Sequence, residues 1–278
     1  MSELLPSRAE GGPPLSGSHS TNGHTPRAHF ADIAERLAAL LPPLDLFQRL
    51  ALIRATIPGR MVFTTSFGLE DQAIGHAIFS QRLSIHVVTL DTGRLFPETH
   101  DVWAETEHRY GVRVRAFVPA QKKVEALVAR QGIDGFRSSV EARHACCDVR
   151  KVIPLGRALV RASGWITGLR AEQSADRARL AIAALDRGRN LVKVSPLLDW
   201  TREQVVDFVR THNVPYNPLH DRGFLSIGCA PCTRAVSPGE PERAGRWWWE
   251  QEAAKECGLH FTADGRVVRA RKPQQGAA

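Results

Sequence analysis

The alternation of short apolar runs with helical segments from Met61 onward is the feature that most constrains the fold. Ser84–Leu90 (SIHVVTL) is a β-prone run, and Pro97–Tyr110 after it has the apolar spacing of a helix. Further β-prone runs lie at Met61–Thr65, Val112–Val118, Trp165–Leu169 and Leu191–Val194, and further helical segments at Glu70–Gln81, Lys122–Arg130, Cys147–Ala162 and Thr201–Thr211. Such alternation is typical of a parallel sheet covered by helices on both faces. We therefore predict an α/β fold whose ligands sit beyond the carboxyl ends of the strands.

Both ends of the chain differ from this pattern. Ala28–Arg60 predicts two helices separated at Pro42-Pro43, whereas Met1–Pro26 is rich in Ser, Gly, Pro and His and predicts a disordered leader, not a secretory signal. Arg243–Glu256 predicts a helix that carries three tryptophans. The domains we expect are a leader at 1–28, an α/β domain with its N-terminal helices at 29–235, and a C-terminal arm at 236–278.

Charge favours an anionic partner. The 278 residues include 37 Lys and Arg against 29 Asp and Glu, a formal net charge of +8. No block of five or more basic residues occurs, so a small anionic ligand is favoured over nucleic acid. No run of 18 apolar residues occurs either, which predicts no membrane span and, with the leader, a cytoplasmic location.

Three glycine-containing loops follow predicted strands. A turn between a strand and a helix directs backbone N–H groups and the positive helix end toward an anion. We expect the loops to form one nucleotide crevice, because carboxyl ends of parallel strands meet at the same sheet edge. The candidate residues are Ser66, Gly68, Leu90, Gly168 and Arg170. The alternative is three ordinary turns, with Arg170 as a solvated surface side chain.

Four of the five cysteines form two tight pairs, Cys146-Cys147 and Cys229-Ala230-Pro231-Cys232. Four thiolates that converge on one point repel each other unless a cation or a cluster neutralises them. A four-cysteine zinc site and an iron–sulfur cluster both satisfy this condition, and the spacing does not separate them. A set of buried free thiols is an alternative for any single cysteine, but not a good one for two pairs.

The fifth cysteine, Cys257, stands in KECGLH, where Lys255 and His260 could lower the pKa of its thiol. Without further information a lone cysteine near a terminus is more often incidental. Arg243 and Arg246 are three residues apart and would share a face of the predicted arm helix. They either clamp an anion or are solvated.

Taken together, eight motifs resemble the sulfonucleotide reductases. In chain order they are SFGLED (Ser66–Asp71), LDTGRLFPET (Leu90–Thr99), CC-x-x-x-K (Cys146–Lys151), ITGLR (Ile166–Arg170), PYNPLHDRG (Pro215–Gly223), IGCAPCT (Ile227–Thr233), GRWWWE (Gly245–Glu250) and KECGLH (Lys255–His260). The resemblance runs in the family's order and covers most of the chain, but not the leader or the first helices.

The resemblance implies a PP-loop-like (adenine nucleotide alpha hydrolase-like) fold and the reduction of adenosine 5′-phosphosulfate (APS) to sulfite and AMP. The residue that matches Cys257 attacks the sulfate sulfur, an enzyme S-sulfocysteine forms, and thioredoxin or a similar dithiol releases sulfite. The residues that match Cys146, Cys147, Cys229 and Cys232 hold one 4Fe–4S cluster per chain in the APS-preferring branch. Lys151, Arg243 and Arg246 match basic residues near the substrate phosphate and sulfate, and we add His260 to the substrate-binding set.

Two departures and three alternatives accompany this prediction. Many relatives have Arg where this chain has Ala171, and the SGGxDS-type loop of PP-loop ATPases is replaced by SFGLED, which argues against ATP pyrophosphate chemistry. The alternatives are a 3′-phospho-APS (PAPS) reductase, a PP-loop tRNA-modifying enzyme, and a non-enzymatic nucleic-acid-binding protein with zinc or a cluster. The sequence leaves the oligomeric state open, a homo-oligomer included.

Overall fold

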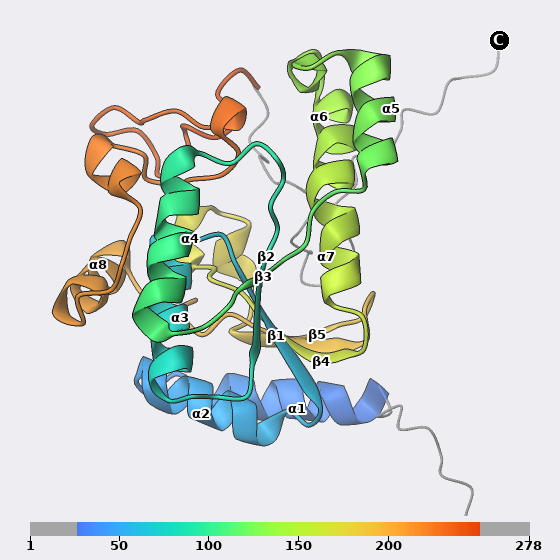
Figure 1. Cartoon of the computed structure of the whole chain (residues 1–278). Helices are drawn as coiled ribbons and strands as arrows, with labels where there is room; N and C mark the ends of the chain where they lie inside the picture. The colour runs from blue at the N-terminus through green and yellow to red at the C-terminus, as the bar shows by residue number, and fades with distance from the viewer. Residues whose placement is uncertain (1–26, 251–278) are drawn as a thin grey trace, which may run out of the picture.

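The computed structural model describes residues 27–250, which fold around one mixed β-sheet with helices on both faces (Figure 1). The strands are β1 (Arg60–Thr65), β2 (His86–Thr89), β3 (Arg115–Ala116), β4 (Ala162–Ile166), β5 (Ala183–Asp186) and β6 (Leu191–Val194), in the sheet order β3-β2-β1-β4-β6-β5. The helices are α1 (Arg27–Leu40), α2 (Leu46–Thr56), α3 (Leu69–Ser80), α4 (Pro97–Tyr110), α5 (Gln121–Gln131), α6 (Val140–Cys147), α7 (Ile153–Ala158) and α8 (Arg202–Thr211).

The predicted parallel sheet is confirmed for every strand except β5. Strands β3, β2, β1, β4 and β6 pair in parallel, whereas β5 pairs antiparallel with β6 at the sheet edge. Three of the four residues of β5, AALD, favour helices and Asp favours neither helix nor strand, so the strand was not predicted. Its geometry comes from the turn after it, where Asp186 accepts hydrogen bonds from the backbone and side chain of Arg189 at 2.9 and 3.0 Å.

The alternation of side chains along β1 separates two cores. Met61 and Phe63 pack in a large core with α1, α2, α3 and α8, while Val62 between them packs on the opposite face with Leu155 of α7 and Trp165. All are at most 1% exposed. Because both faces of β1 are buried, Met61, Val62 and Phe63 are all apolar, and helices cover the sheet on both sides (Figure 1).

Helix boundaries follow the capping signals that the sequence contains. The predicted capping box at Thr201 is confirmed, since its hydroxyl accepts from the amide of Gln204, whose side chain accepts from Thr201. Asp45 caps α2 in the same way after the Pro42-Pro43 break. Ser139 caps α6, so this helix starts seven residues before the predicted Cys147.

Four predicted elements differ from the structure. β4 ends at Ile166, earlier than predicted, and β3 is only two residues long. Between α6 and α7 the helix widens into a π-helical turn over Asp148–Val152. The helix predicted from Arg243 is absent over residues 243–250, because Arg246 forms a β-bridge with Thr233 and Trp247 has a positive φ of 43°. The leader up to Pro26 and the arm after Glu250 lie outside the described residues.

Candidate active site

The three glycine-containing loops meet at one cavity of about 200 Å³ beyond the carboxyl ends of β1, β2 and β4. Seven predicted binding residues line it: Ser66, Gly68, Leu90, Lys151, Gly168, Arg243 and Arg246. The predicted convergence of the loops is therefore confirmed, and the contact of these residues with a substrate stays a prediction. We call this space the nucleotide cavity.

Asp71 holds two of these loops together. Its Oδ2 accepts hydrogen bonds from the amide and the hydroxyl of Ser66 at 2.6 and 2.7 Å. Gly168 comes so close to it that a Cβ atom there would lie 2.2 Å from Asp71 Oδ1. Burial raises the pKa of Asp71 to about 6, although the hydrogen bonds from Ser66 and Gly168 oppose this shift. Gly168 is thus required by close packing between the loops.

The cavity also contains residues that the sequence analysis did not select. Thr64 and Trp165 form part of the wall and are joined by a hydrogen bond of 2.9 Å from the indole N–H to the hydroxyl. Arg177, His220 and Glu242 line the polar side. The PYNPLHDRG motif contains His220, but Arg177, which begins the short 3-10 turn Arg177–Arg179, lies outside every motif.

A second, smaller cavity brings the four paired cysteines together. Cys146, Cys147, Cys229 and Cys232 line it together with Phe136 and Trp247, and none of the four forms a disulfide. Cys147, Cys229 and Cys232 are buried and Cys146 is partly exposed. Within residues 27–250, no three or more His, Cys, Asp or Glu side chains are placed so that they could hold a metal ion. We call this space the cysteine cavity.

Burial and mutual repulsion oppose ionisation of these thiols. Burial, with the neighbouring Cys229 and Cys146, raises the pKa of Cys232 to about 11, although Lys151 and Arg246 act in the opposite direction. Burial also raises the pKa of Cys229, but Lys151 and the Thr92 hydroxyl, helped by two arginines, outweigh it and the net pKa is lowered. The cavity therefore holds charge partners for thiolate sulfur.

Donors suited to sulfur surround the cysteine cavity. Thr92 Oγ1 lies 3.3 Å from Cys229 Sγ. The indole N–H of Trp247 is buried and has no hydrogen-bond partner among residues 27–250. Two guanidinium groups lie over its ring, with the central carbon of Arg143 at 4.5 Å and that of Arg246 at 4.7 Å from the ring centroid. A buried indole usually finds an acceptor, and Trp247 lines both the cysteine cavity and the nucleotide cavity.

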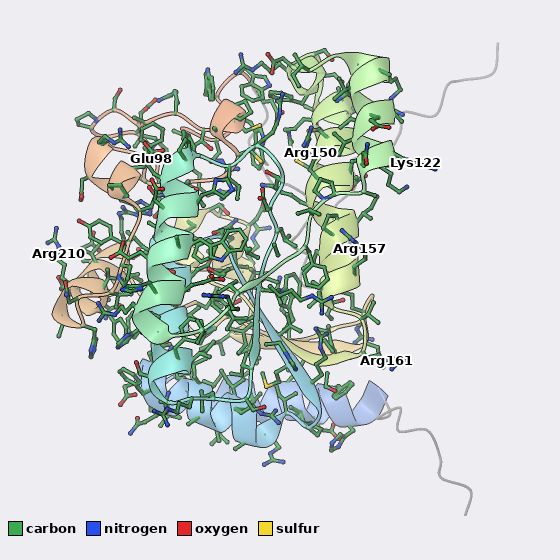
Figure 2. All side chains as sticks on the ribbon, in the orientation of Figure 1. Glu98, Lys122, Arg150, Arg157, Arg161 and Arg210 are labelled. Atoms are coloured by element: carbon green, nitrogen blue, oxygen red, sulfur yellow. The ribbon has the colours of Figure 1, made fainter. Side chains whose placement is uncertain are left out.

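Lys151 and Arg246 line both cavities and therefore lie between them. Lys151 belongs to the π-helical turn, a local widening that is frequent at functional sites. Arg246 is 6% exposed and its Nε donates to Cys232 O at 3.4 Å. Arg150, one residue before Lys151, donates to Thr92 O at 2.6 Å (Figure 2). Outer basic residues such as Lys122 lie at the periphery in the same view.

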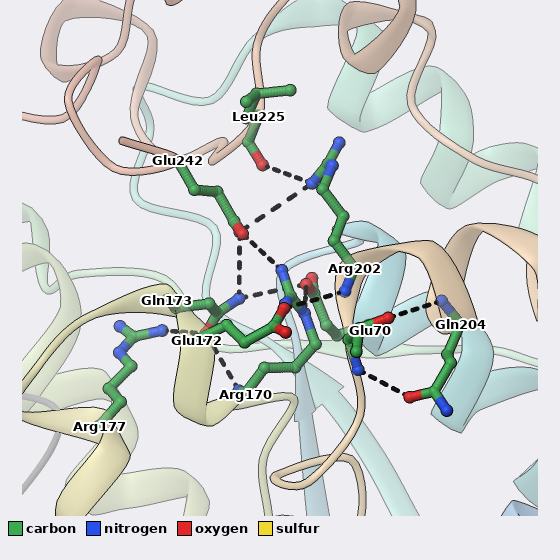
Figure 3. A network of polar contacts seen from close by, with 10 residues as sticks. Glu70, Arg170, Glu172, Gln173, Arg177, Arg202, Gln204, Leu225 and Glu242 are labelled. Atoms are coloured by element: carbon green, nitrogen blue, oxygen red, sulfur yellow. Dashed lines mark hydrogen bonds and ion pairs between the residues drawn. The ribbon is translucent and has the colours of Figure 1, made fainter. Parts of the chain in front are cut away.

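Arg170, predicted to contact substrate, does not line the nucleotide cavity. Its guanidinium group is 0% exposed and donates to three carboxylates, those of Glu70 at 2.7 Å, Glu172 at 3.0 Å and Glu242 at 2.5 Å (Figure 3). Burial lowers the pKa of Arg170, but Glu70 and Glu242 more than offset this, so the net shift is upward. Two of these carboxylates, Glu70 and Glu242, line the nucleotide cavity, and the contact of Arg170 with a substrate stays a prediction.

Two predicted site residues, Cys257 and His260, lie outside the described residues. No helix in the described part of the chain is long and apolar enough to cross a membrane. The roles of Cys257 and His260 stay predictions.

Comparison with known proteins identifies the family. Residues 60–235 match the model of the phosphoadenosine phosphosulfate reductase domain. The chain is 57% identical to an adenosine 5′-phosphosulfate reductase of Agrobacterium fabrum over 83% of its own length and 88% of the relative's. It is 52% identical to the protein of that name in Allochromatium vinosum, over 72% and 78% of the two chains. The crystal structure of a PAPS reductase from Candida auris has the same fold, with 24% identity and a TM-score of 0.61 over 73% of this chain and 96% of that one. The chain therefore belongs to the phosphoadenosine phosphosulfate reductase family, the sulfonucleotide reductases.

Proposed function

We propose that this protein reduces APS to sulfite and AMP in assimilatory sulfate reduction, the route to cysteine. The observation that carries the proposal is that the nucleotide cavity and the cysteine cavity share Lys151 and Arg246. Two cations between a nucleotide site and a group of four thiols suit a substrate with adjacent phosphate and sulfate. The relatives named APS reductase, 57% and 52% identical, support the choice of APS.

In the proposed first step the Cys257 thiolate attacks the sulfur atom of APS. A bond forms between Cys257 Sγ and this sulfur, and the bond from sulfur to the phosphate oxygen breaks. The electron pair of the broken bond leaves on AMP, and an S-sulfocysteine remains on the enzyme. Lys151, Arg243 and Arg246 would offset the repulsion between a thiolate and an anionic substrate and the charge that develops on the leaving phosphate.

In the second step a dithiol protein such as thioredoxin is the reductant. Its thiolate attacks Cys257 Sγ, the bond to the sulfonate breaks, and sulfite leaves with the electron pair. The second thiol of the donor then displaces Cys257 from the mixed disulfide. The donor becomes oxidised to a disulfide, the substrate sulfur is reduced by two electrons, and the Cys257 thiol is restored. A cytoplasmic location, where thiols stay reduced, belongs to this proposal.

The proposal includes one 4Fe–4S cluster per chain, held by Cys146, Cys147, Cys229 and Cys232. The fit is supported by four thiols around one cavity, by the Thr92 hydroxyl at 3.3 Å from Cys229 Sγ, and by the buried Trp247 N–H, which is without a partner among the described residues. When bound, the cluster would neutralise the thiolates and shape the electrostatic field next to Lys151 without carrying redox turnover. Lys151 and Arg246 themselves would orient the substrate from their places between the cavities.

Trapping the intermediate tests the proposed reaction. Protein incubated with APS without a dithiol should gain one sulfonate on the peptide that contains Cys257, and a dithiol should remove it. Cys257→Ser should still bind APS but form neither adduct nor sulfite. An adduct on another cysteine, or turnover of the variant at the wild-type rate, would exclude Cys257 as the nucleophile.

The substrate assignment has its own test. The family model and the Candida auris structure carry the PAPS name, whereas the relatives of higher identity carry the APS name. Steady-state rates with each nucleotide and thioredoxin should give the larger kcat/KM for APS. An equal or larger kcat/KM for PAPS would assign the protein to the PAPS-reducing branch of the family.

A further inference from the structure

Residues 237–247, which we call the strap, contain no helix or strand, and four of them, Glu242, Arg243, Arg246 and Trp247, line the nucleotide cavity. Within the strap the backbone hydrogen bonds close local turns, such as Ala244 N to Pro241 O at 2.8 Å and Arg246 N to Arg243 O at 2.9 Å. At its C-terminal end, bonds from Arg234 N to Gly245 O at 3.0 Å and from Trp247 N to Cys232 O at 3.2 Å join it to the C-x-x-C region. Its position must therefore come from a few longer contacts. One of these is the bridge between Arg246 and Thr233 at the end of the strap.

Glu242 provides a contact in the middle of the strap. Its carboxylate accepts from Arg170 Nη2 at 2.5 Å and from Gln173 Nε2 at 3.5 Å, and Arg202 lies 3.9 Å away (Figure 3). The Glu242 side chain is 14% exposed and that of Arg170 is 0% exposed. The next residue in the chain is Arg243, which faces the cavity.

We propose that Arg170 is a positioning residue that acts through Glu242: the ion pair fixes the strap so that Arg243 and Arg246 face the substrate anion. This inference rests on the proposed function for the identity of that anion. Arg170 follows Gly168 by two residues, and its Nε binds Glu70, which follows Gly68 by two. One guanidinium group thereby connects the strap to both anion-binding loops.

The charges explain why an arginine suits this position. Burial of the Glu242 carboxylate without a partner would carry a large desolvation cost. The side chain would move toward solvent, and the strap would move with it. The planar guanidinium offers five donors in a fixed geometry, so it can hold carboxylates from three chain segments at once. A lysine could not reproduce this arrangement. Arg170 itself stays behind the wall, and the substrate meets only the residues that it places.

Two neutralising substitutions provide the test. Glu242→Gln and Glu172→Gln each remove one carboxylate from Arg170, but Glu172 is 51% exposed, lies two residues from Arg170 and does not line the cavity. Glu242→Gln should raise the KM for APS roughly tenfold, because small displacements of binding groups are costly. Glu172→Gln should change it less than about twofold. Equal effects of the two substitutions would overturn the proposal.

Hydrogen exchange gives a readout that needs no substrate. The amides of Ala244 and Arg246 should exchange at least about tenfold faster in Glu242→Gln than in Glu172→Gln. Unchanged exchange in Glu242→Gln would show that the strap does not depend on the ion pair, whatever the enzyme reduces. If the wild type does not use APS, the proposed function is wrong. The exchange measurement still shows whether the position of the strap depends on the ion pair between Arg170 and Glu242.

A double-mutant cycle separates positioning from general damage. In protein that already carries Arg243→Ala and Arg246→Ala, Glu242→Gln should have little further effect on AMP binding, because the residues it positions are gone. Additive losses of AMP affinity would show that Glu242 acts by another route and would contradict the inference.

Discussion

Thr92 Oγ1 lies 3.3 Å from Cys229 Sγ, so the loop that follows β2 touches the C-x-x-C loop directly. The two loops are also joined by a backbone hydrogen bond of 2.8 Å from Ala230 N to Arg94 O. Leu90, two residues before Thr92, lines the nucleotide cavity. One short loop therefore borders both cavities, since Leu90 and Thr92 line the nucleotide cavity and Arg94 lines the cysteine cavity.

Gly168→Ala should damage the nucleotide cavity. The new Cβ would lie 2.2 Å from Asp71 Oδ1, so Asp71 must move and give up its bonds to Ser66. We expect a loss of stability of about 1–3 kcal/mol, typical of overpacking, measured by denaturant unfolding, and weaker AMP binding by calorimetry. Gly156→Ala in α7 is the control, because its Cβ meets no atom within 4 Å and alanine favours a helix. A Gly168→Ala protein with normal AMP affinity would contradict the close packing.

Removal of the cations should lower catalytic efficiency. Lys151→Ala, Arg243→Ala and Arg246→Ala should each decrease kcat/KM by roughly ten- to a thousandfold, or about 1.5–4 kcal/mol, as expected for charge-assisted contacts in a partly buried site. Lys122→Ala at the molecular periphery should leave it unchanged (Figure 2). If kcat/KM is normal in all three cavity variants, the anion binds elsewhere.

Iron and sulfide should be present in the cysteine cavity. Anaerobically purified protein should contain about four irons per chain with matching sulfide, as four thiolates around a cubane require. Cys232→Ser should lose most of this iron, because it removes one of the four thiols that line the cavity. Stoichiometric zinc without sulfide would exclude the cluster and would weaken the preference for APS that is derived from it.

The sequence predicted what depends on local patterns. Apolar alternation predicted the parallel strands, and Thr201-x-x-Gln204 predicted the start of α8, because both signals act within a few residues. The convergence of Ser66, Leu90 and Gly168 followed from the common direction of parallel strands. Long-range packing was beyond such patterns.

The role of Arg170 shows this limit. A guanidinium at a strand end suggested an anion site, and only the fold could reveal that Glu242, 72 residues later in the chain, would occupy it. The helix predicted from Arg243 was wrong for the same reason. This tryptophan-rich segment has helical spacing, but a β-bridge to Thr233 holds it in another conformation. Both features depend on contacts between segments that are distant in the sequence.

Acid should destabilise the fold through His76. Burial, with His212 and Arg109, lowers the pKa of His76 from 6.5 to about 4. Between pH 6.5 and about 4, His76 is protonated in the unfolded chain but not in the folded chain. The free energy of unfolding therefore decreases as the pH falls through this range. Urea unfolding across these pH values should show a shallower dependence for His76→Gln than for the wild type. The exposed His86 is the control, and His86→Gln should follow the wild-type curve.

Trp247→Phe should show whether the buried indole N–H of Trp247 donates a hydrogen bond to cluster sulfur. Phenylalanine keeps an aromatic ring against Arg143 and Arg246, whose guanidinium carbons lie 4.5 and 4.7 Å from the Trp247 centroid, so packing is largely kept. The lost N–H has no partner among the described residues, so protein without iron should keep its stability to within about 1 kcal/mol. Iron-loaded protein should lose about 1–2 kcal/mol more, because a hydrogen bond to sulfur is then removed.

Trp165→Phe is the matched control, since it removes an indole N–H that already donates to Thr64 Oγ1 at 2.9 Å. It should destabilise the iron-free and the iron-loaded protein equally, whereas Trp247→Phe should do so unequally. The measurement is the difference in unfolding free energy between the two forms of each variant. Equal losses for Trp247→Phe would mean that its N–H does not face the sulfur, and the strongest structural support for a cluster in the cysteine cavity would then be removed.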